Sequence, residues 1–421
     1  MARLQRLLQG NYLSIPVTTK FTTHDGNDKF AYAVCATQGW RTVMEDTHIT
    51  QLNLDQRDET NALFAVFDGH SDIAPSKFAS ENLHKILVAG TEYTEKAYPK
   101  ALKKAFLETD AQLSKFVGNF GGCTATVSLI TPEGTIYVAN AGDSRAVLSV
   151  KGEAKPLSVD HKPNVETEKA RITGAGGFVE RNRVNGEIAM SRALGDFRLK
   201  KNSELPPEKQ AVTSDPEITQ HQLSGEDEFL VLACDGIWDC VSSQDVVNMV
   251  RLFLSQGMTL PKVCEEICNH CIAPNADGAF GNDNMTIVIV ALLQGRTTEE
   301  WYKWITERTT SRYGYETPEK PPQLYSPTAL KYFKEKMEVY EEGKRKRKEL
   351  KARKLQAEDG AGVPVVDKAV DEVGDQDHQV IQSQGDDSRE AGGFQTKPQF
   401  DETQPSGGSE NVAEVASAQT G

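Results

Sequence analysis

The sequence predicts an α+β fold: an antiparallel β-sandwich flanked by helices in α-β-β-α layers, with a helical C-terminal appendage and a disordered tail. Short apolar segments recur along the chain and are joined by glycine-containing turns such as Thr131–Gly134, which favour antiparallel hairpins. Longer segments between them repeat apolar residues at the period of an amphipathic helix. Antiparallel strands and segregated helices pack as layers, so two sheets between helices are expected.

The expected strands are runs of apolar and β-branched residues that stop at glycine, proline or polar residues. In chain order they are 31–36, 62–67, 123–130, 135–140, 145–150, 229–234 and 286–293. The expected helices each carry one apolar face, and in chain order they are 73–87, 96–116, 165–173, 243–255 and 260–271. These elements follow one another without a break, which indicates one large domain.

From Thr297 onward the strand pattern is absent. Trp301, Trp304 and Ile305 predict one short helix that docks on the core. Pro318–Pro327 is expected to be an irregular connector.

A last helix is expected over Thr328–Leu355, and it becomes strongly basic at Lys344–Lys348. Beyond it, Ala357–Gly421 is rich in Gly, Gln, Ser and acidic residues and poor in aromatics, which is typical of disorder. The role of the basic run stays open between a nuclear localisation signal, a patch for anionic partners and a solvated helix face.

Charge separates the folded part from the tail. The chain of 421 residues has a formal net charge of −14, and residues 357–421 contain 14 acidic and 3 basic residues, which supply most of it. No basic face is evident before residue 300, so nucleic-acid binding is not expected. No apolar run is long enough to span a membrane, and the seven cysteines form no regular framework, so an intracellular protein is expected.

One apolar segment ends at three residues that can carry chemistry. Ala62–Phe67 is followed directly by Asp68, Gly69 and His70. A carboxylate at the end of a buried strand needs a partner or a cation, glycine lets the backbone approach a ligand, and histidine titrates near neutral pH. Taken alone, an Asp-Gly pair is more often a simple turn.

Repetition of this ending changes the interpretation. The strand expected at 229–234 runs into Asp235, and Asp283 precedes the strand expected at 286–293. Three carboxylates at the ends of three apolar strands predict a cation site assembled from distant parts of the chain.

A second cluster consists of Arg41, Glu45 and Asp46. A guanidinium can hold two oxygens of a phosphate, and adjacent carboxylates can hold water-coordinated Mg²⁺ or Mn²⁺. Weaker motifs, each more often structural than functional, lie at 121–125, 142–145, 160–163 and 191–196, the last after a glycine-rich stretch that resembles a mobile flap.

In combination these motifs resemble the protein phosphatase 2C family, of fungal or other eukaryotic type. The segments that carry the resemblance occur in that family's order: Arg41–Asp46, Asp68–His70, Gly121–Ala125, Gly142–Arg145, Asp160–Pro163, Arg183–Asp196, Asp235–Gly236 and Asp283–Asn284. The similarity covers residues 20–293. It implies a metal-dependent protein serine/threonine phosphatase with a binuclear Mg²⁺ or Mn²⁺ centre in a β-sandwich.

The resemblance also implies a domain organisation. Residues 1–22 would be an N-terminal extension and 23–293 the phosphatase catalytic domain. Residues 294–356 would be a helical, basic C-terminal segment and 357–421 a disordered acidic tail.

Metal ligands follow from the resemblance residue by residue. Asp68 would bridge two cations, and Gly69 would contribute its carbonyl to one of them. Asp235 and Asp283 would complete the site of the other. Asp143 would help to form a weaker third-metal site.

The remaining roles concern water and the phosphate. Glu45 and Asp46 would act through coordinated water, and a hydroxide between the two cations would attack phosphorus in line. Arg41 would hold the phosphoryl oxygens, and His70 would protonate the departing seryl or threonyl oxygen as a general acid. The partners would be proteins that carry phosphoserine or phosphothreonine.

Three other interpretations compete with this one. Cys35 and Arg41 have the spacing of a cysteine-dependent phosphatase loop, but Cys35 lies in an expected strand and no helix follows it. Cys264, Cys268 and Cys271 could suggest zinc, but their spacing places them on one apolar helical face, which favours core packing. The chain could also be a scaffold with a vestigial site. We expect a monomeric enzyme in the cytoplasm and nucleus.

Overall fold

The computed structural model describes residues 12–55, 60–119 and 121–359, with side chains to residue 352. The chain divides into a unit of Met1–Arg353 and a second unit of Lys354–Gly421. Residues 360–421 of the predicted tail lie outside the described residues. Among the helices that are described, none is both long enough and apolar enough to cross a membrane.

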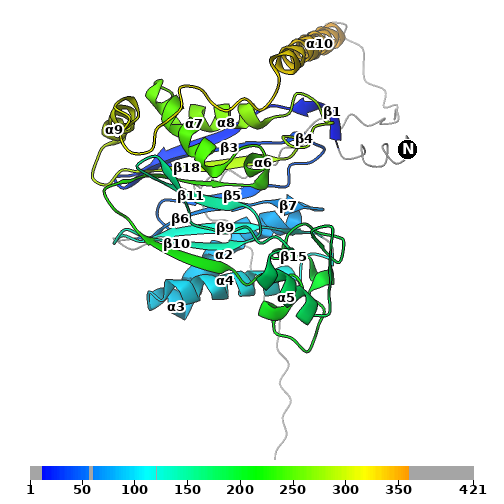
Figure 1. Cartoon of the computed structure of the whole chain (residues 1–421). Helices are drawn as coiled ribbons and strands as arrows, with labels where there is room; N and C mark the ends of the chain where they lie inside the picture. Colours follow the sequence, from blue (N-terminus) through cyan, green and yellow to red (C-terminus); the bar gives the residue numbers. More distant parts are fainter. Residues whose placement is uncertain (1–11, 56–59, 120, 360–421) are drawn as a thin grey trace, which may run out of the picture. The chain divides into compact units, whose positions relative to one another are not determined.

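Two antiparallel sheets face each other in the first unit (Figure 1). The five-stranded sheet consists, in spatial order, of β16 (Glu217–Gln222), β10 (Thr135–Ala141), β9 (Ala125–Ile130), β6 (Ala62–Phe67) and β5 (Thr47–Gln51). The six-stranded sheet consists of β12 (Glu153–Pro156), β11 (Arg145–Val150), β17 (Asp227–Ala233), β18 (Met285–Leu292), β3 (Phe30–Thr37) and β2 (Phe21–Gly26).

Strands at the centre of the sandwich are buried on both faces, which explains their continuous apolar sequence. In β6, Phe64 and Val66 join the core between the sheets, whereas Leu63, Ala65 and Phe67 join the core beneath the helices. All six residues of β6 are buried. The strand therefore holds its C-terminal end rigidly.

Helices cover the outer face of each sheet. The five-stranded sheet is covered by α2 (Ala74–Ala89) and α4 (Tyr98–Leu113), with the short α3 (Thr91–Thr94) beside them, and the six-stranded sheet by α7 (Ser243–Ser255) and α8 (Leu260–Cys271) (Figure 1). Ser242 caps α7 by accepting a hydrogen bond from Asp245 N (3.1 Å). The predicted α-β-β-α layers are confirmed.

Several expected elements have the bounds that periodicity indicates, namely β6, β11, α7 and α8. The strand expected at 123–130 is broken at Thr124 into β8 (Gly122–Cys123) and β9. The helix expected at 96–116 is shorter and is represented by α4. Sequence reasoning missed β2, β5, β12 and β16, which are short, polar or at sheet edges, where tertiary pairing decides the structure.

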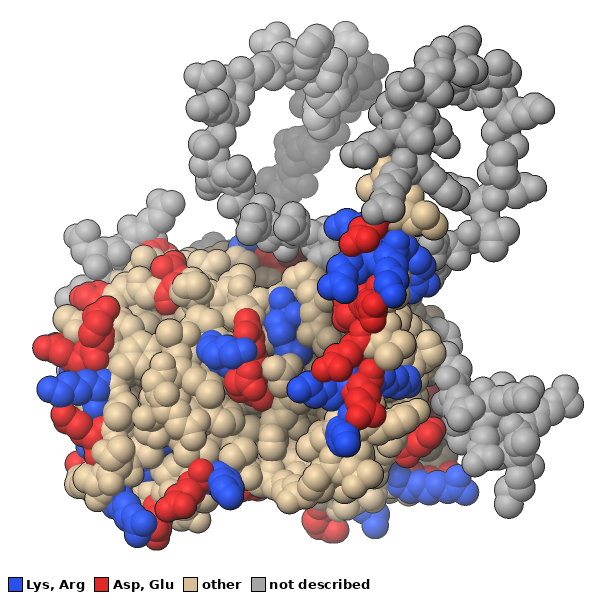
Figure 2. Space-filling view, turned by 90° about the horizontal axis from the view of Figure 1, so that it is seen from above, with Lys and Arg blue, Asp and Glu red and all other residues tan. Residues whose placement is uncertain are grey.

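The C-terminal part begins with α9 (Thr298–Thr310), which starts at a capping box of Thr297 and Glu300. Trp301 and Ile305 are fully buried in the core beneath α7 and α8, which confirms the docked helix. The last helix is α10 (Pro327–Asp359), and it contains the basic run. Figure 2 shows Lys and Arg interspersed with Asp and Glu along this exposed helix.

The N-terminal residues that are described form β1 (Tyr12–Val17), which pairs with β4 (Gly39–Arg41) in a small sheet of its own. The proposed boundaries at 22, 293 and 356 stay predictions. Cys264, Cys268 and Cys271 are fully buried, so core packing, rather than an open zinc site, accounts for them.

Candidate active site

Asp68 follows β6 directly, and its backbone is held by Thr124, the residue between β8 and β9. Asp68 N donates to Thr124 Oγ1 (3.1 Å), and Thr124 N donates to the Asp68 carbonyl (2.9 Å). Burial, followed by the charges of Asp235, Asp46 and Asp283, raises the pKa of Asp68 well above its ordinary value. The chain thus brings these four acids to one place.

Asp46 is the most buried of these acids, with 7% of its surface exposed. Its Oδ2 accepts a hydrogen bond from Thr286 Oγ1 (2.8 Å), and its Oδ1 is buried with no hydrogen-bond partner. Burial raises the pKa of Asp46 to about 7. Asp46, Asp68 and Cys234 each place one ligand atom within 4.8 Å of the other two.

Cys234 itself is a poor candidate ligand for a hard cation. Burial raises the pKa of its thiol well above the ordinary value, so the sulfur stays protonated. Cys234 Sγ also donates to the Asn284 carbonyl (3.5 Å). The carboxylate oxygens of Asp46 and Asp68 are therefore better candidate ligands for such a cation than the Cys234 sulfur.

Asp235 is the first residue of α6 (Asp235–Trp238), the short helix that follows β17. Burial and the charges of Asp143 and Asp283 raise the pKa of Asp235 well above its ordinary value.

Asn284, beside Asp283, connects the end of the six-stranded sheet to the segments on either side of β4, which contains Arg41. Its Nδ2 donates to the carbonyls of Gln38 (2.9 Å) and Val43 (3.0 Å).

Gly69 needs to be glycine because another backbone passes close to it. A Cβ at this position would collide with the Glu45 carbonyl. Ser76 Oγ donates to the same carbonyl (2.5 Å), which ties Glu45 to the start of α2. Burial raises the pKa of Glu45 above its ordinary value, and the charges of Arg41 and His70 oppose that shift.

Arg41 forms an ion pair with Asp283 and thereby reaches the acidic cluster. Its side chain is 36% exposed, and its Nε is buried without a hydrogen-bond partner. Burial lowers the pKa of the guanidinium, but the charges of Asp283 and Tyr12 outweigh burial and raise it. The group is a permanent cation beside the carboxylates.

Asp143 is buried in the turn before β11 and pairs with Lys162, and its charge acts on both Asp68 and Asp235. Asp239, one helical turn after Asp235, belongs to the same group: burial raises its pKa, Lys162 lowers it, and Asp143 and Asp283 raise it. Sequence reasoning missed Asp239. Its spacing of four residues from Asp235 was the available signal.

His70 meets a carboxylate that also had no role in the sequence interpretation. It ends β7 (Gly69–His70), which pairs with β8, and β8 pairs with β15 (Leu194–Gly195). Asp196 follows β15, and its fully buried Oδ2 lies 2.7 Å from His70 Nε2. A Cβ on Gly122, which lies opposite His70 in the register, would collide with this carboxylate.

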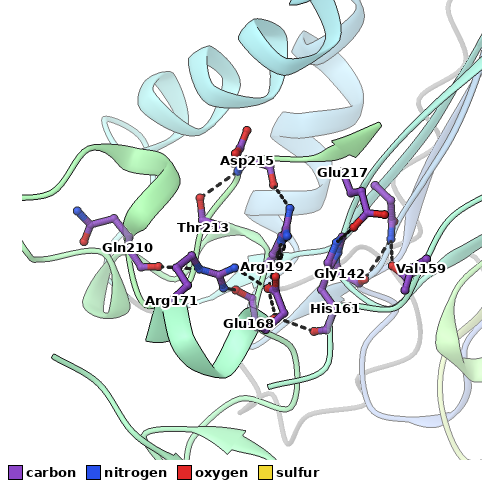
Figure 3. A network of polar contacts seen from close by, with 12 residues as sticks. Gly142, Val159, His161, Glu168, Arg171, Arg192, Gln210, Thr213, Asp215 and Glu217 are labelled. Carbon is purple, nitrogen blue, oxygen red and sulfur yellow. Dashed lines mark hydrogen bonds and ion pairs between the residues drawn. The ribbon is translucent and has the colours of Figure 1, made fainter. Parts of the chain in front are cut away.

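A buried ionic network fixes the segment that leads to Asp196 (Figure 3). Glu168 of α5 (Glu166–Gly174) is 3% exposed and accepts hydrogen bonds from Arg171 Nη1 (2.6 Å) and Arg192 Nη2 (2.7 Å). Ser191 Oγ donates to Glu168 (2.5 Å), and Arg171 Nη2 donates to the Ser191 carbonyl (2.6 Å). Three of these four charge-assisted bonds cross between the 191–196 segment and α5, and the fourth, between Arg171 and Glu168, orients Glu168 within the helix.

His161 lies beside the same network and is buried. Burial, together with the charge of Arg192, lowers the pKa of His161 to about 3. The ring is therefore neutral, and its Nδ1 accepts a hydrogen bond from Gly142 N (3.2 Å). This contact joins the network to the turn that carries Asp143 (Figure 3).

All nine site residues expected from the sequence lie in or directly beside this one acidic cluster. Cys35, the residue of the competing thiolate interpretation, is fully buried inside β3.

Comparison with known proteins identifies the family of the chain. The family model described as Protein phosphatase 2C matches residues 30–279. The chain belongs to the protein phosphatase 2C family. It is 48% identical to Protein phosphatase 2C homolog 2 of Hypocrea jecorina over 75% of this chain and 73% of that protein, and 46% identical to Protein phosphatase 2C homolog 2 of Schizosaccharomyces pombe over 76% and 89%.

A solved structure extends the likeness to three dimensions. A phosphatase from Toxoplasma gondii matches with a TM-score of 0.56 at 27% sequence identity, over 65% of this chain and 96% of that one. As a member of the protein phosphatase 2C family, the chain is a metal-dependent protein serine/threonine phosphatase.

Proposed function

We propose that the chain removes phosphate from phosphoserine and phosphothreonine in proteins by direct attack of water, at a two-metal site formed by the acidic cluster. One observation carries the proposal. At least four carboxylates crowd together so closely that burial and mutual repulsion raise the pKa values of Asp46, Asp68 and Asp235. Such a cluster is costly unless cations compensate it.

The donor set fits Mg²⁺ or Mn²⁺. Both ions prefer oxygen ligands, and the cluster offers carboxylates of which two oxygens, Asp46 Oδ1 and Asp143 Oδ1, are buried with no hydrogen-bond partner. Asp68, Asp235, Asp283 and the Gly69 carbonyl would hold two ions. Glu45 and Asp46 would bind these ions through coordinated water. Asp143 and Asp239 would form a weaker third site.

Bound there, divalent cations would lower the pKa of a coordinated water to about 7, which supplies a nucleophile at neutral pH. Arg41 would hold the phosphoryl group. Its guanidinium is a fixed positive charge at the cluster, and its ion pair with Asp283 is replaceable once that carboxylate holds a cation. Holding the phosphoryl oxygens would both orient the substrate and stabilise charge in the transition state.

His70 would donate a proton to the leaving oxygen. Asp196 occupies Nε2, so Nδ1, which is buried without a hydrogen-bond partner, is the nitrogen left for the leaving group. The buried carboxylate would also fix the ring orientation. A general acid of this kind contributes typically about 10²–10⁴-fold in rate.

Leaving-group dependence tests the assignment of His70. His70→Ala is expected to slow hydrolysis of a phosphothreonine peptide far more than hydrolysis of an activated aryl phosphate, whose leaving group needs no proton. Asp196→Asn is expected to show the same selectivity to a smaller degree. Equal losses on both substrates would contradict a general-acid role.

Metal dependence tests the site as a whole. The full chain should release phosphate from a phosphothreonine peptide with Mg²⁺ or Mn²⁺, and a chelator should abolish the reaction. Thiol alkylation should leave it intact, because Cys35 is buried in β3. Activity that survives chelation but not alkylation would overturn the proposal in favour of a thiolate enzyme.

A further inference from the structure

The small sheet of β1 and β4 places an N-terminal aromatic residue next to Arg41. Tyr12 is the register partner of Arg41, and Val17 is the partner of Gly39. The guanidinium carbon of Arg41 lies 5.9 Å from the centre of the Tyr12 ring. This distance is within the range of a cation–π contact.

Contacts on both sides hold β1 in this register. Thr37 Oγ1 donates to the carbonyls of Val17 (3.1 Å) and Thr19 (3.0 Å). On the other side, Lys336 of α10 donates to the Ser14 carbonyl (3.2 Å). Strand β1 is therefore fastened both to β3 and to the last helix.

The same helix packs on the residue that precedes Arg41. Phe333 and Lys336 lie against the Trp40 ring, with centroid distances of 6.5 Å and 5.6 Å. Trp40 is 1% exposed, and its Nε1 donates to the Ala273 carbonyl (2.9 Å). The residue before Arg41, the candidate phosphate-binding residue, is thus held rigidly in β4.

Tyr12, Ser14, Phe333 and Lys336 all lie outside residues 30–279, the part that matches the family model. The residues that contact Arg41 or its strand here therefore belong to the segments expected to be the N-terminal extension (1–22) and the helical C-terminal segment (294–356). These contacts therefore reach Arg41 from outside the matched region.

We infer that Tyr12 is a positioning residue for the phosphoryl group: its ring holds the Arg41 guanidinium in place for phosphate binding. The inference rests on the proposed function, in which Arg41 binds the phosphoryl oxygens. In the structure, Arg41 is shared between Asp283 and the ring. When Asp283 is engaged with a cation, the ring is the contact that remains, and it limits the rotamers that the guanidinium samples.

The test compares leucine and phenylalanine at position 12 in the full chain with Mn²⁺. Tyr12→Leu removes the ring and is expected to raise both the KM for a phosphothreonine peptide and the inhibition constant of inorganic phosphate by about two- to fivefold, with a smaller change in kcat. Tyr12→Phe keeps the ring and is expected to behave as the wild type. Tyr332→Leu, at a 67% exposed tyrosine of α10, is the matched control and should change neither constant.

A double-mutant cycle separates this inference from the proposed function. In an Arg41→Ala background, Tyr12→Leu should have no further effect on the phosphate inhibition constant. If Arg41→Ala alone leaves that constant unchanged, the proposed role of Arg41 fails. If Arg41→Ala raises the phosphate inhibition constant but Tyr12→Leu does not, the positioning role of Tyr12 is overturned. It is also overturned if Tyr12→Leu raises that constant equally in the wild-type and Arg41→Ala backgrounds. Phenylalanine as damaging as leucine would also overturn it.

Discussion

Replacing Asp46 with asparagine should stabilise the metal-free protein at neutral pH while weakening its response to metal. Asp46 is buried, accepts one hydrogen bond from Thr286 and has a second oxygen with no hydrogen-bond partner. Burial raises its pKa from the ordinary 3.8 to about 7. Without a cation, the ionised form is therefore an unfavourable feature of the folded state.

The direction and size follow from proton linkage. Because the folded-state pKa is the higher one, the folded protein binds more protons than the unfolded chain between pH 4 and 7, and stability falls as pH rises through that window. The full effect of the ionised carboxylate is about 4 kcal/mol. An asparagine leaves an amide donor without a partner, at a cost of about 1–3 kcal/mol, so a net gain of about 1–3 kcal/mol is expected at pH 7.5.

The assay is urea unfolding of wild type and Asp46→Asn in excess chelator at pH 7.5 and at pH 5. The gain should be present at pH 7.5 and much smaller or reversed at pH 5, where Asp46 is largely protonated. Asp277→Asn, at an exposed site, is the matched control and should be neutral at both values. Saturating Mn²⁺ should stabilise the wild type more than the variant. An Asp46→Asn protein that is less stable than the wild type in chelator at pH 7.5, or that gains equally at both values, would refute the reasoning.

Two further substitutions probe the supports of the site. Gly122→Ala should displace Asp196 from His70, because the new Cβ would collide with the Asp196 carboxylate. Turnover of a phosphopeptide should then fall much more than turnover of an aryl phosphate. An equal fall on both substrates would count against a role for the contact between Asp196 and His70. Glu168→Gln should lower the free energy of unfolding at pH 7 by about 3 kcal/mol, because it leaves Arg171 and Arg192 without their buried anion, as thermal or urea unfolding would report. Burial raises the pKa of Glu168, but the bonds from Arg192 and Arg171 outweigh burial and lower this pKa to about 2. The stability that the Glu168 carboxylate contributes should therefore be fully present above pH 4.5 and should vanish as pH falls toward 2. A flat profile across that range would contradict the network's role.

The central part of the fold and most of the site could be predicted from the sequence because the signals there are local. Strand β6 is apolar on both faces and stops at Asp68, so its burial and its polar end are both visible in the residue order. Helices α7 and α8 show their apolar faces by periodicity alone.

Other features depend on tertiary pairing and could not be predicted from local signals. Asp196 was visible as part of a motif, but its contact with His70 requires β15 and β7 to flank β8. The pairing of β1 with β4 joins segments whose composition gives no register. The domain boundaries, the cytoplasmic and nuclear localisation, the monomeric state and the role of the basic run in α10 stay predictions.

The number of cations held by the acidic cluster tests the central claim most directly. Mn²⁺ binding to the full chain, measured by titration calorimetry alongside phosphate release from a phosphothreonine peptide, is expected to give two strongly bound ions for the wild type. Asp68→Asn should lose at least one of them together with nearly all turnover. Two ions and full turnover in Asp68→Asn, or a wild type that turns over without any bound divalent cation, would contradict the account.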